Sequence, residues 1–297
     1  MTTPLPLLTG TELLVTLFAF VTLLGDAWFL FVGLSVLYWL GPRIDDTVRP
    51  AAATVIALAT LALAVVLALK SYTAVPRPAA LPIDPSGLPD ALAGFVASEI
   101  DSSGFTFPSG HATGATAVYG GLAALLRVGR RQLRYGAAVS VIVLVSVSRV
   151  VLGVHYLRDI LAGMALGVLL IAVGRRLARD DALFRVDRVF LLAGVTSVVG
   201  LVVAADAGHT AAVRHAMIGL GTAAGGTATW RRFGDRLRDA PAVSIPVAAA
   251  GLVVAGGFVI GAYAGLFGLA GAAIGATVGM GCILGLPLVE RWRKKRS

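Results

Sequence analysis

The chain has 297 residues, of which 57% are hydrophobic and only 14% are charged. Soluble domains usually carry about 25% charged residues, so this composition excludes an ordinary water-soluble protein and indicates a membrane protein. The formal net charge of +9 does not indicate a nucleic-acid partner, because the basic residues lie in short loops between apolar blocks, as they do in membrane proteins.

The apolar blocks are long enough to cross a bilayer as helices, which takes about 20 residues each. We therefore predict an all-α, polytopic helical membrane protein. The stretch 11–41 is too long for one simple span and is interrupted at Gly25-Asp26, so we expect its first part to be an interfacial helix. The nine predicted spans are, in chain order, 21–41, 51–70, 111–127, 135–153, 158–175, 189–206, 211–230, 243–263 and 269–289.

The basic residues predict the orientation of these spans. With the N-terminus outside, 20 of the 25 Lys and Arg residues fall in segments on the inner side. The positive-inside rule then predicts a multi-pass protein of the cell (plasma) membrane, with its N-terminus outside and its C-terminus in the cytoplasm. No Lys or Arg precedes Arg43, so we expect no cleavable signal peptide.

The segments between the spans suggest how the chain is organised. The longest, 71–110, is rich in Pro and Gly, and we expect residues 88–100 in it to form a short amphipathic helix. Long loops in compact folds are often functional. A charged stretch at 175–188 divides the chain into a first membrane domain, 1–178, and a C-terminal membrane extension of about four helices, 179–297.

Three polar clusters lie at the predicted outer ends of spans, within 70–78, 107–111 and 148–159. Lys70, Arg77 and Arg149 bring three cations to one side of the membrane, and a phosphate group suits the fork of a guanidinium. Ser109 and Gly110 stand where a helix should begin, and the free backbone N–H groups at a helix N-terminus bind anions. The clusters therefore predict a phosphate site.

Two histidines in these clusters suggest chemistry at that site. His155 and Asp159 are four residues apart, so on a helix they would share a face. Asp159 could then accept a hydrogen bond from one ring nitrogen of His155 and leave the other free to attack. His111 would be the second titrating group, which protonates a leaving alcohol and later deprotonates water.

Each residue also has a simpler interpretation. Lys70 and Arg77 could be interfacial cations that reach to the headgroups, Ser109 could only cap a helix, and either histidine could be interfacial or structural. Arg149 is harder to explain in this way, because a charge within an apolar run is expensive in a membrane. The joint pattern on one predicted face favours the functional interpretation.

The three clusters resemble the signature of the phosphatidic acid phosphatase type 2 superfamily: Lys-x6-Arg-Pro, Pro-Ser-Gly-His and Ser-Arg-x5-His-x3-Asp. All motif positions match, from Lys70 to Asp159, and the resemblance covers roughly residues 10–178. Integral-membrane members of the superfamily have six spans, whereas this region holds five clear spans and the possible interfacial helix. The resemblance implies nothing firm about residues 179–297.

The resemblance also implies a role for each residue, with no cofactor and no metal. His155 would accept the phosphoryl group, Asp159 would orient it and His111 would be the general acid. We expect no additional cluster of His, Cys and Asp on this face that would suggest a metal site. The residues that would hold the phosphate are Lys70, Arg77, Ser109, Gly110 and Arg149.

We therefore expect a metal-independent phosphatase whose substrate is a lipid phosphate or an isoprenyl diphosphate, with its active site on the extracytoplasmic face. A phosphotransferase would use the same phosphohistidine, and a transporter could bind an anion without chemistry. Small-residue repeats, such as Gly271, Gly275 and Gly279, let helices approach closely. They predict ordinary packing within the bundle or a homodimer interface.

Overall fold

A computed structural model describes residues 10–79, 88–101, 103–178, 185–266 and 268–294 of the chain. No strand occurs among these residues, and an isolated antiparallel bridge joins Pro76 to Phe105. The all-α prediction is therefore confirmed. The helices are α1 (Gly10–Thr22), α2 (Ala27–Leu40), α3 (Val48–Thr73), α4 (Asp90–Glu99), α5 (Gly110–Ala115), α6 (Gly121–Leu125), α7 (Arg131–Val151), α8 (Leu157–Ala178), α9 (Val186–Asp206), α10 (Thr210–Arg238), α11 (Ile245–Tyr263) and α12 (Gly268–Lys294).

Six of these helices, α3, α7, α8, α9, α11 and α12, are long and apolar enough to cross a membrane. A seventh candidate is the pair Gly10–Gly25 and Ala27–Arg43, which is bent by 49° at the Gly25-Asp26 interruption. The chain is thus a multi-pass membrane protein, as its sequence predicts. The expected short helix in 88–100 is also present, as α4.

Two predicted spans, 111–127 and 211–230, are helical but are not among these candidates. The first is divided into α5, a π-helical turn at Thr116–Gly120 and α6, which together cover only 110–125. The second lies in α10, which is long but less apolar. α10 packs against α9, α12 and α3, so much of its surface faces other helices instead of lipid.

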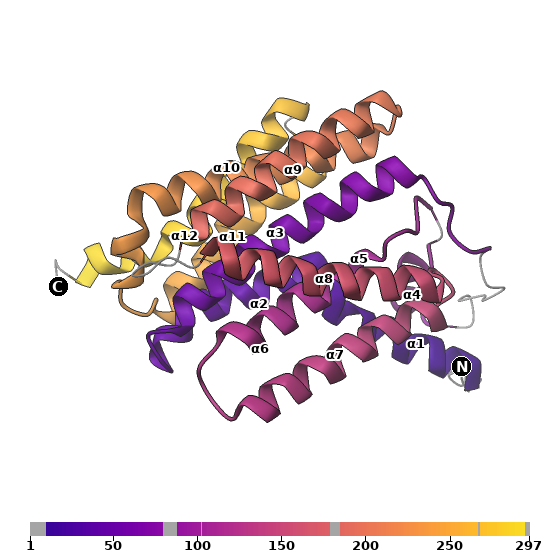
Figure 1. Cartoon of the computed structure of the whole chain (residues 1–297), viewed down its shortest axis with the longest axis horizontal. Coiled ribbons are helices and arrows are strands. Elements are labelled where there is room, and N and C mark those ends of the chain that lie inside the picture. The colour runs from indigo at the N-terminus through magenta and orange to yellow at the C-terminus, as the bar shows by residue number, and fades with distance from the viewer. Residues whose placement is uncertain (1–9, 80–87, 102, 179–184, 267, 295–297) are drawn as a thin grey trace, which may run out of the picture.

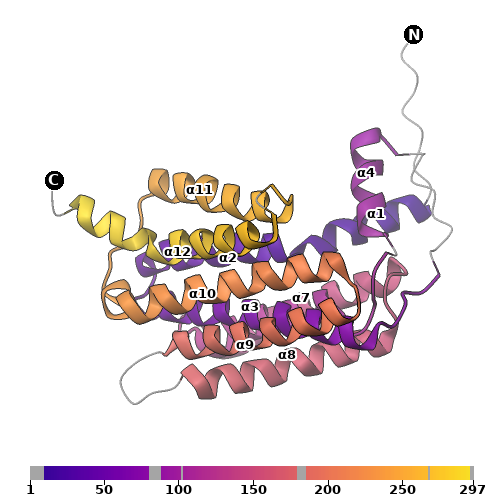
Figure 2. The same cartoon turned by 90° about the horizontal axis from the view of Figure 1, so that it is seen from above.

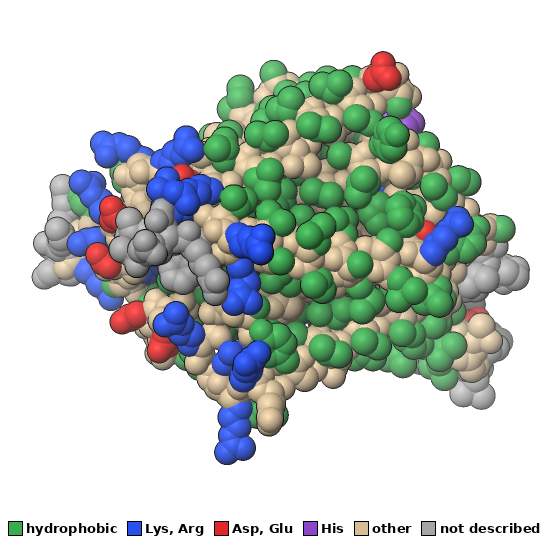
Figure 3. All heavy atoms as spheres, viewed as in Figure 1, with side chains coloured by type: hydrophobic (Ala, Val, Ile, Leu, Met, Phe, Trp, Pro, Cys, Tyr) green, Lys and Arg blue, Asp and Glu red, His purple; other side chains and the backbone are tan. Residues whose placement is uncertain are grey.

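The long helices run side by side along the molecule, with α1 and α4 at the end opposite the C-terminus (Figures 1 and 2). Figure 3 shows Lys and Arg side chains gathered at the end that carries the C-terminus, while hydrophobic side chains cover most of the remaining face. The two ends of the bundle therefore differ in charge, in the way that the count of basic loop residues predicts. Which end faces the cytoplasm stays a prediction.

One hydrophobic core joins the two predicted domains. It contains Ile56 of α3, Phe190 of α9 and Leu284 of α12, all essentially inaccessible to solvent. Hydrogen bonds also cross the boundary: the Tyr38 hydroxyl donates to the Leu284 carbonyl at 2.9 Å. The buried Arg49 donates to carbonyls of Tyr38, Leu237, Ala240 and Pro241. The division at 178/179 stays a prediction about function, because the two parts are packed together.

The small-residue repeats pack helices within the chain. A Cβ on Gly221 would lie 2.0 Å from the Ala273 carbonyl oxygen, and one on Gly225 would lie 2.3 Å from that of Thr277. These glycines of α10 therefore allow the close approach of α12. The homodimer stays an untested prediction, but the repeat of Gly221 and Gly225 packs against α12 of the same chain.

Candidate functional site

The three polar clusters meet at the end of the bundle where α3 and α7 end and α5 and α8 begin. The loop before α5 is fastened to the residues that end or follow α3. Thr106 N–H donates to the Val75 carbonyl at 2.9 Å, and the Thr73 hydroxyl donates to the Phe107 carbonyl at 3.2 Å. The loop therefore lies against the segment that carries Lys70 and Arg77.

Helices α5 and α8 are in close contact beside this loop. A Cβ on Gly163 of α8 would lie 2.8 Å from the Ser109 carbonyl oxygen, and one on Gly167 would lie 2.5 Å from the Thr116 Cβ. Only glycine fits at this distance without a shift of the backbone. The Ser109 N–H donates to the Asp159 carbonyl at 3.1 Å, so the second and third clusters are in direct contact.

Thr106 stands between His155 and Asp159. Its hydroxyl donates to Asp159 Oδ2 at 2.5 Å and lies 2.9 Å from His155 Nδ1. The hydroxyl has one proton, so it can accept from an Nδ1–H at the same time. His155 is 4% exposed, while Thr106 and Asp159 are fully buried.

This geometry corrects the simple helical pair expected from the sequence. His155 precedes α8 instead of lying on it, and its Nδ1 is 3.5 Å from Asp159 Oδ2, beyond a normal hydrogen bond. The helix begins later because Asp159 Oδ2 accepts the Tyr156 N–H at 2.8 Å and closes a turn there. The contact of Asp159 with His155 thus runs mainly through the Thr106 hydroxyl.

Each of the three cations is held by a neighbour on this end of the molecule. Lys70 Nζ donates to the Phe105 carbonyl at 2.8 Å, and Arg77 Nη1 donates to the Asp101 carbonyl at 3.2 Å. Arg149, which is 4% exposed, donates to Glu99 Oε2 at 3.2 Å and to the Thr22 hydroxyl at 2.8 Å. The buried Nε atoms of both arginines have no hydrogen-bond partner in the described chain, so each retains a donor.

The charges of these groups act on His155. Burial, followed by the positive charges of Lys70, Arg77 and Arg149, holds the pKa of His155 well below its ordinary value of 6.5. A lowered pKa leaves the imidazole uncharged at neutral pH, the form that has a lone pair for attack. The charges of Lys70, Arg77 and Arg149 thus act on the ring that the sequence predicted as the nucleophile.

Ser109 and His111 have partners as well. The Ser109 side chain accepts from the Ala112 N–H at 3.4 Å and caps α5, which is the simpler of the two interpretations that its position allowed. His111 Nε2 lies 2.7 Å from Asp26 Oδ1, and the Trp28 indole donates to Asp26 Oδ2 at 3.1 Å. Gly110 begins α5, but whether its amide binds a phosphate stays a prediction.

Asp26, Glu99 and His111 form a cluster that the sequence did not reveal. Their ligand atoms all lie within 4.8 Å of one another, whereas no metal-ligating group was expected on this face beyond the motif residues. The three residues come from different parts of the chain, the α1–α2 break, α4 and α5, so their spacing along the sequence does not indicate the cluster, and the metal-free mechanism stays a prediction. Glu99 is also committed to Arg149 by an ion pair.

The sequence-based prediction therefore missed four residues of the candidate site: Thr22, Asp26, Glu99 and Thr106. Asp26 had a signal in the sequence, because a carboxylate that interrupts an apolar stretch is costly in a membrane and usually has a function. Glu99 and Thr106 had none, since their contacts join residues about fifty positions apart. Such contacts follow only from the tertiary fold.

Comparison with known proteins places the motif region in context. A family model described as the PAP2 superfamily matches residues 51–181, which include all three polar clusters. Phosphatidylglycerophosphatase B of Bacillus subtilis (strain 168) is 40% identical over 77 residues, which are 24% of this chain and 38% of that protein. The match thus spans well under half of the relative's length. No solved structure matches the chain.

Proposed function

We propose that the chain, whose residues 51–181 match the model of the PAP2 superfamily, is an integral-membrane phosphatase for lipid phosphate monoesters or isoprenyl diphosphates. The observation that carries the proposal is the arrangement around His155. Thr106 and Asp159 hold its Nδ1, and three cations act on the same ring. A nucleophile and an anion site thus occupy one place.

The first step proposed is attack by His155. With Nδ1 held as the N–H form, the lone pair on Nε2 attacks phosphorus and forms a P–N bond, while the bond from phosphorus to the leaving oxygen breaks. Lys70, Arg77 and Arg149 stabilise the negative charge on the phosphoryl oxygens. The positive charge that develops on the imidazole is balanced by Asp159 through Thr106, as in other His–carboxylate pairs.

The second part of the proposal concerns His111. It gives a proton to the leaving oxygen, which departs as an alcohol or as a phosphate. It then takes a proton from water, whose oxygen attacks phosphorus and breaks the P–N bond, so that inorganic phosphate is released and His155 is regenerated. We assign Asp26 the role of positioning residue for His111, on the basis of their 2.7 Å contact.

The membrane setting suits a substrate whose tail stays in the bilayer. Lys70 and Arg149 lie at the ends of the spans α3 and α7, where a lipid headgroup would meet them. On the orientation predicted from the basic loops, this end of the bundle faces the extracytoplasmic side of the plasma membrane. The relative's name suggests phosphatidylglycerol phosphate as a substrate to be tested first.

The proposal is tested with the purified full chain in lipid nanodiscs. Phosphate release is measured on phosphatidate, a prenyl diphosphate and phosphatidylglycerol phosphate, in EDTA and with or without vanadate. We expect turnover of at least one substrate, resistance to EDTA because protein cations supply the positive charge, and inhibition by vanadate. An added acceptor alcohol distinguishes the alternatives, since a phosphotransferase would pass the phosphate to it.

The matched variants are His155→Ala and His215→Ala. His215 lies in α10 against Tyr263 and is not part of the three clusters. We expect His155→Ala to lose at least about 1,000-fold in kcat, as removal of an enzymic nucleophile does, and His215→Ala to remain active. Near-normal phosphate release by a folded His155→Ala protein would refute the assignment.

A further inference from the structure

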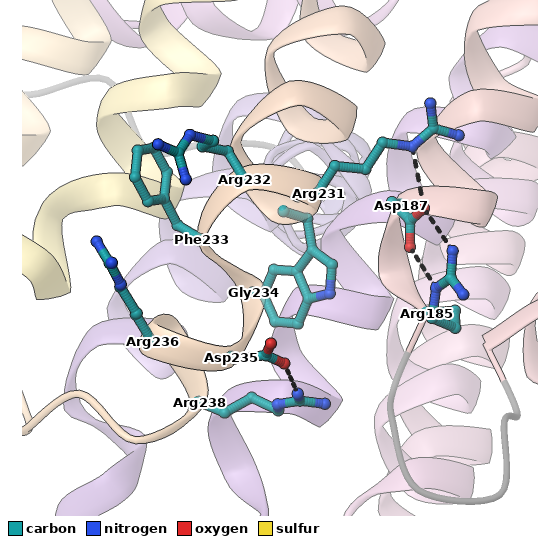
Figure 4. A pocket seen from close by; sticks show the side chains of 10 residues that line it. Arg185, Asp187, Arg231, Arg232, Phe233, Gly234, Asp235, Arg236 and Arg238 are labelled. Atoms are coloured by element: carbon teal, nitrogen blue, oxygen red, sulfur yellow. Dashed lines mark hydrogen bonds and ion pairs between the residues drawn. The ribbon is translucent and has the colours of Figure 1, made fainter.

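Figure 4 shows an arginine-lined pocket. It lies at the opposite end of the bundle from the candidate active site, because α8 begins at that site and ends at Ala178, shortly before α9 begins at Val186. Its volume is about 320 Å³, and it is formed where α9 begins and α10 ends. α9 has 21 residues, so the pocket lies roughly 30 Å along the helix from its other end, at 1.5 Å per residue. The pocket is lined by Arg185, Asp187, Trp230, Arg231, Arg232, Phe233, Gly234, Asp235, Arg236 and Arg238.

The carboxylates of the pocket are already committed to arginines, as the dashed lines in Figure 4 show. Asp187, which is nearly fully buried, pairs with Arg185 at 3.2 Å and with Arg231 at 3.1 Å. Asp235 pairs with Arg238. The lining holds five arginines and two aspartates, so three positive charges are not balanced by the acids that line it.

Arg232 and Arg236 carry much of this excess. Both are exposed, and neither forms an ion pair with a residue in the described part of the chain. The Arg232 guanidinium lies 5.4 Å from the centre of the Phe233 ring, and the mostly buried Trp230 also lines the pocket. The pocket therefore combines two exposed guanidinium groups with two aromatic side chains where α9 begins and α10 ends.

We propose that this pocket binds the phosphate of an anionic lipid headgroup in the leaflet opposite the candidate active site. Guanidinium groups match phosphate oxygens in a fork geometry, and basic pockets between transmembrane helices bind anionic headgroups. Aromatic side chains are enriched at the membrane–water interface, which is the depth at which a polar lipid headgroup meets its apolar acyl chains. The site lies in the C-terminal extension, outside the matched residues 51–181.

The test is native mass spectrometry of the full chain in detergent, titrated with phosphatidylglycerol or with phosphatidylcholine of the same acyl chains. We expect tighter binding of phosphatidylglycerol, and a loss of about 10-fold in its affinity in the double variant Arg232→Gln/Arg236→Gln. The control is Arg127→Gln/Arg130→Gln, which removes the same charge from two exposed arginines outside the pocket. It is expected to retain the wild-type affinity.

Any of three results would overturn the proposal. Equal losses in the two double variants would mean that the arginines act only through overall charge. No preference for phosphatidylglycerol in the wild type would mean that binding does not depend on the charge of the headgroup. Displacement of the bound lipid by millimolar inorganic phosphate would identify a site for a soluble anion instead. If the double variant fails to fold, the single variant Arg236→Gln, compared with Arg130→Gln, decides between the same outcomes.

Discussion

The hydroxyl of Thr106 makes the contact with His155 Nδ1 that the sequence analysis expected of Asp159. Motif spacing predicted the histidine and the carboxylate correctly as neighbours, but not the group between them. The reason is that Thr106 reaches both from a loop about fifty residues earlier in the chain. Local periodicity reports only on residues a few positions apart, so contacts of this kind stay invisible until the fold is known.

Replacing Thr106 should therefore impair the proposed nucleophile. Thr106→Val keeps the shape but removes the acceptor for Nδ1–H, so the tautomer of His155 is no longer fixed. We expect kcat to fall about 10- to 100-fold, less than the roughly 10,000-fold known for loss of the orienting carboxylate in a catalytic triad. Thr106→Ser retains the hydroxyl and should be nearly normal. Equal rates for the two variants, measured by phosphate release, would contradict the role.

Asp26 should matter most when the leaving group needs a proton. Asp26→Asn keeps an acceptor for His111 but removes the negative charge that supports its protonated form. On an alkyl phosphate we expect kcat to fall about 10-fold, within the usual contribution of general acid catalysis. On p-nitrophenyl phosphate the rate should change little, because nitrophenolate departs without protonation. Equal losses on both substrates would point to a structural role instead.

At the scale of the elements, the contact between α5 and α8 sets the distance between the motifs. The glycines of α8 were visible in the sequence, but a stripe of small residues does not reveal its partner. His155 and Asp159 were expected on one helix, but α8 begins at Leu157, after His155, and the Asp159 side chain in its first turn accepts the Tyr156 N–H. Helix ends depend on such side-chain bonds, which hydrophobic periodicity cannot report.

The close approach of these helices gives a prediction for Gly163. In Gly163→Ala the new Cβ would stand 2.8 Å from the Ser109 carbonyl oxygen, so α8 must move away from α5. Small misplacements of catalytic groups can cost about 100-fold, and we expect a loss of 10-fold or more in kcat/KM. The control is Gly136→Ala in α7, where nothing lies within 4 Å. Similar activities of the two variants would show that the contact is unimportant.

At the scale of the whole molecule, the distribution of charged residues and apolar blocks predicted more of the structure than it did within the candidate site. The helical membrane class and the segregation of basic residues to one end (Figure 3) follow from composition and loop charge alone. The packing of α10 did not follow, since a helix that lies against three others need not be as apolar as one that faces lipid. Arg49 is fully buried, which loop charge did not indicate, because its guanidinium donates to carbonyls almost two hundred residues later, such as those of Leu237 and Pro241.

The orientation is tested by cysteine accessibility in intact cells. In a Cys282→Ser background, Ser103→Cys and Arg130→Cys place single, exposed thiols near the candidate site and at the basic end. A membrane-impermeant maleimide should label Ser103→Cys in intact cells, whereas Arg130→Cys should be labelled only after lysis. The reverse pattern would place the candidate site on the cytoplasmic side.

The central claim is that one imidazole, His155, carries the phosphoryl group during turnover. The most direct measurement is rapid quenching of the working enzyme with a radiolabelled lipid phosphate, digestion at alkaline pH and localisation of the label by mass spectrometry. We predict acid-labile phosphate on Nε2 of His155, and none in His155→Ala. Label on another residue would contradict the mechanism. So would full turnover without any phosphohistidine, measured with a substrate for which the phosphoenzyme forms faster than it is hydrolysed.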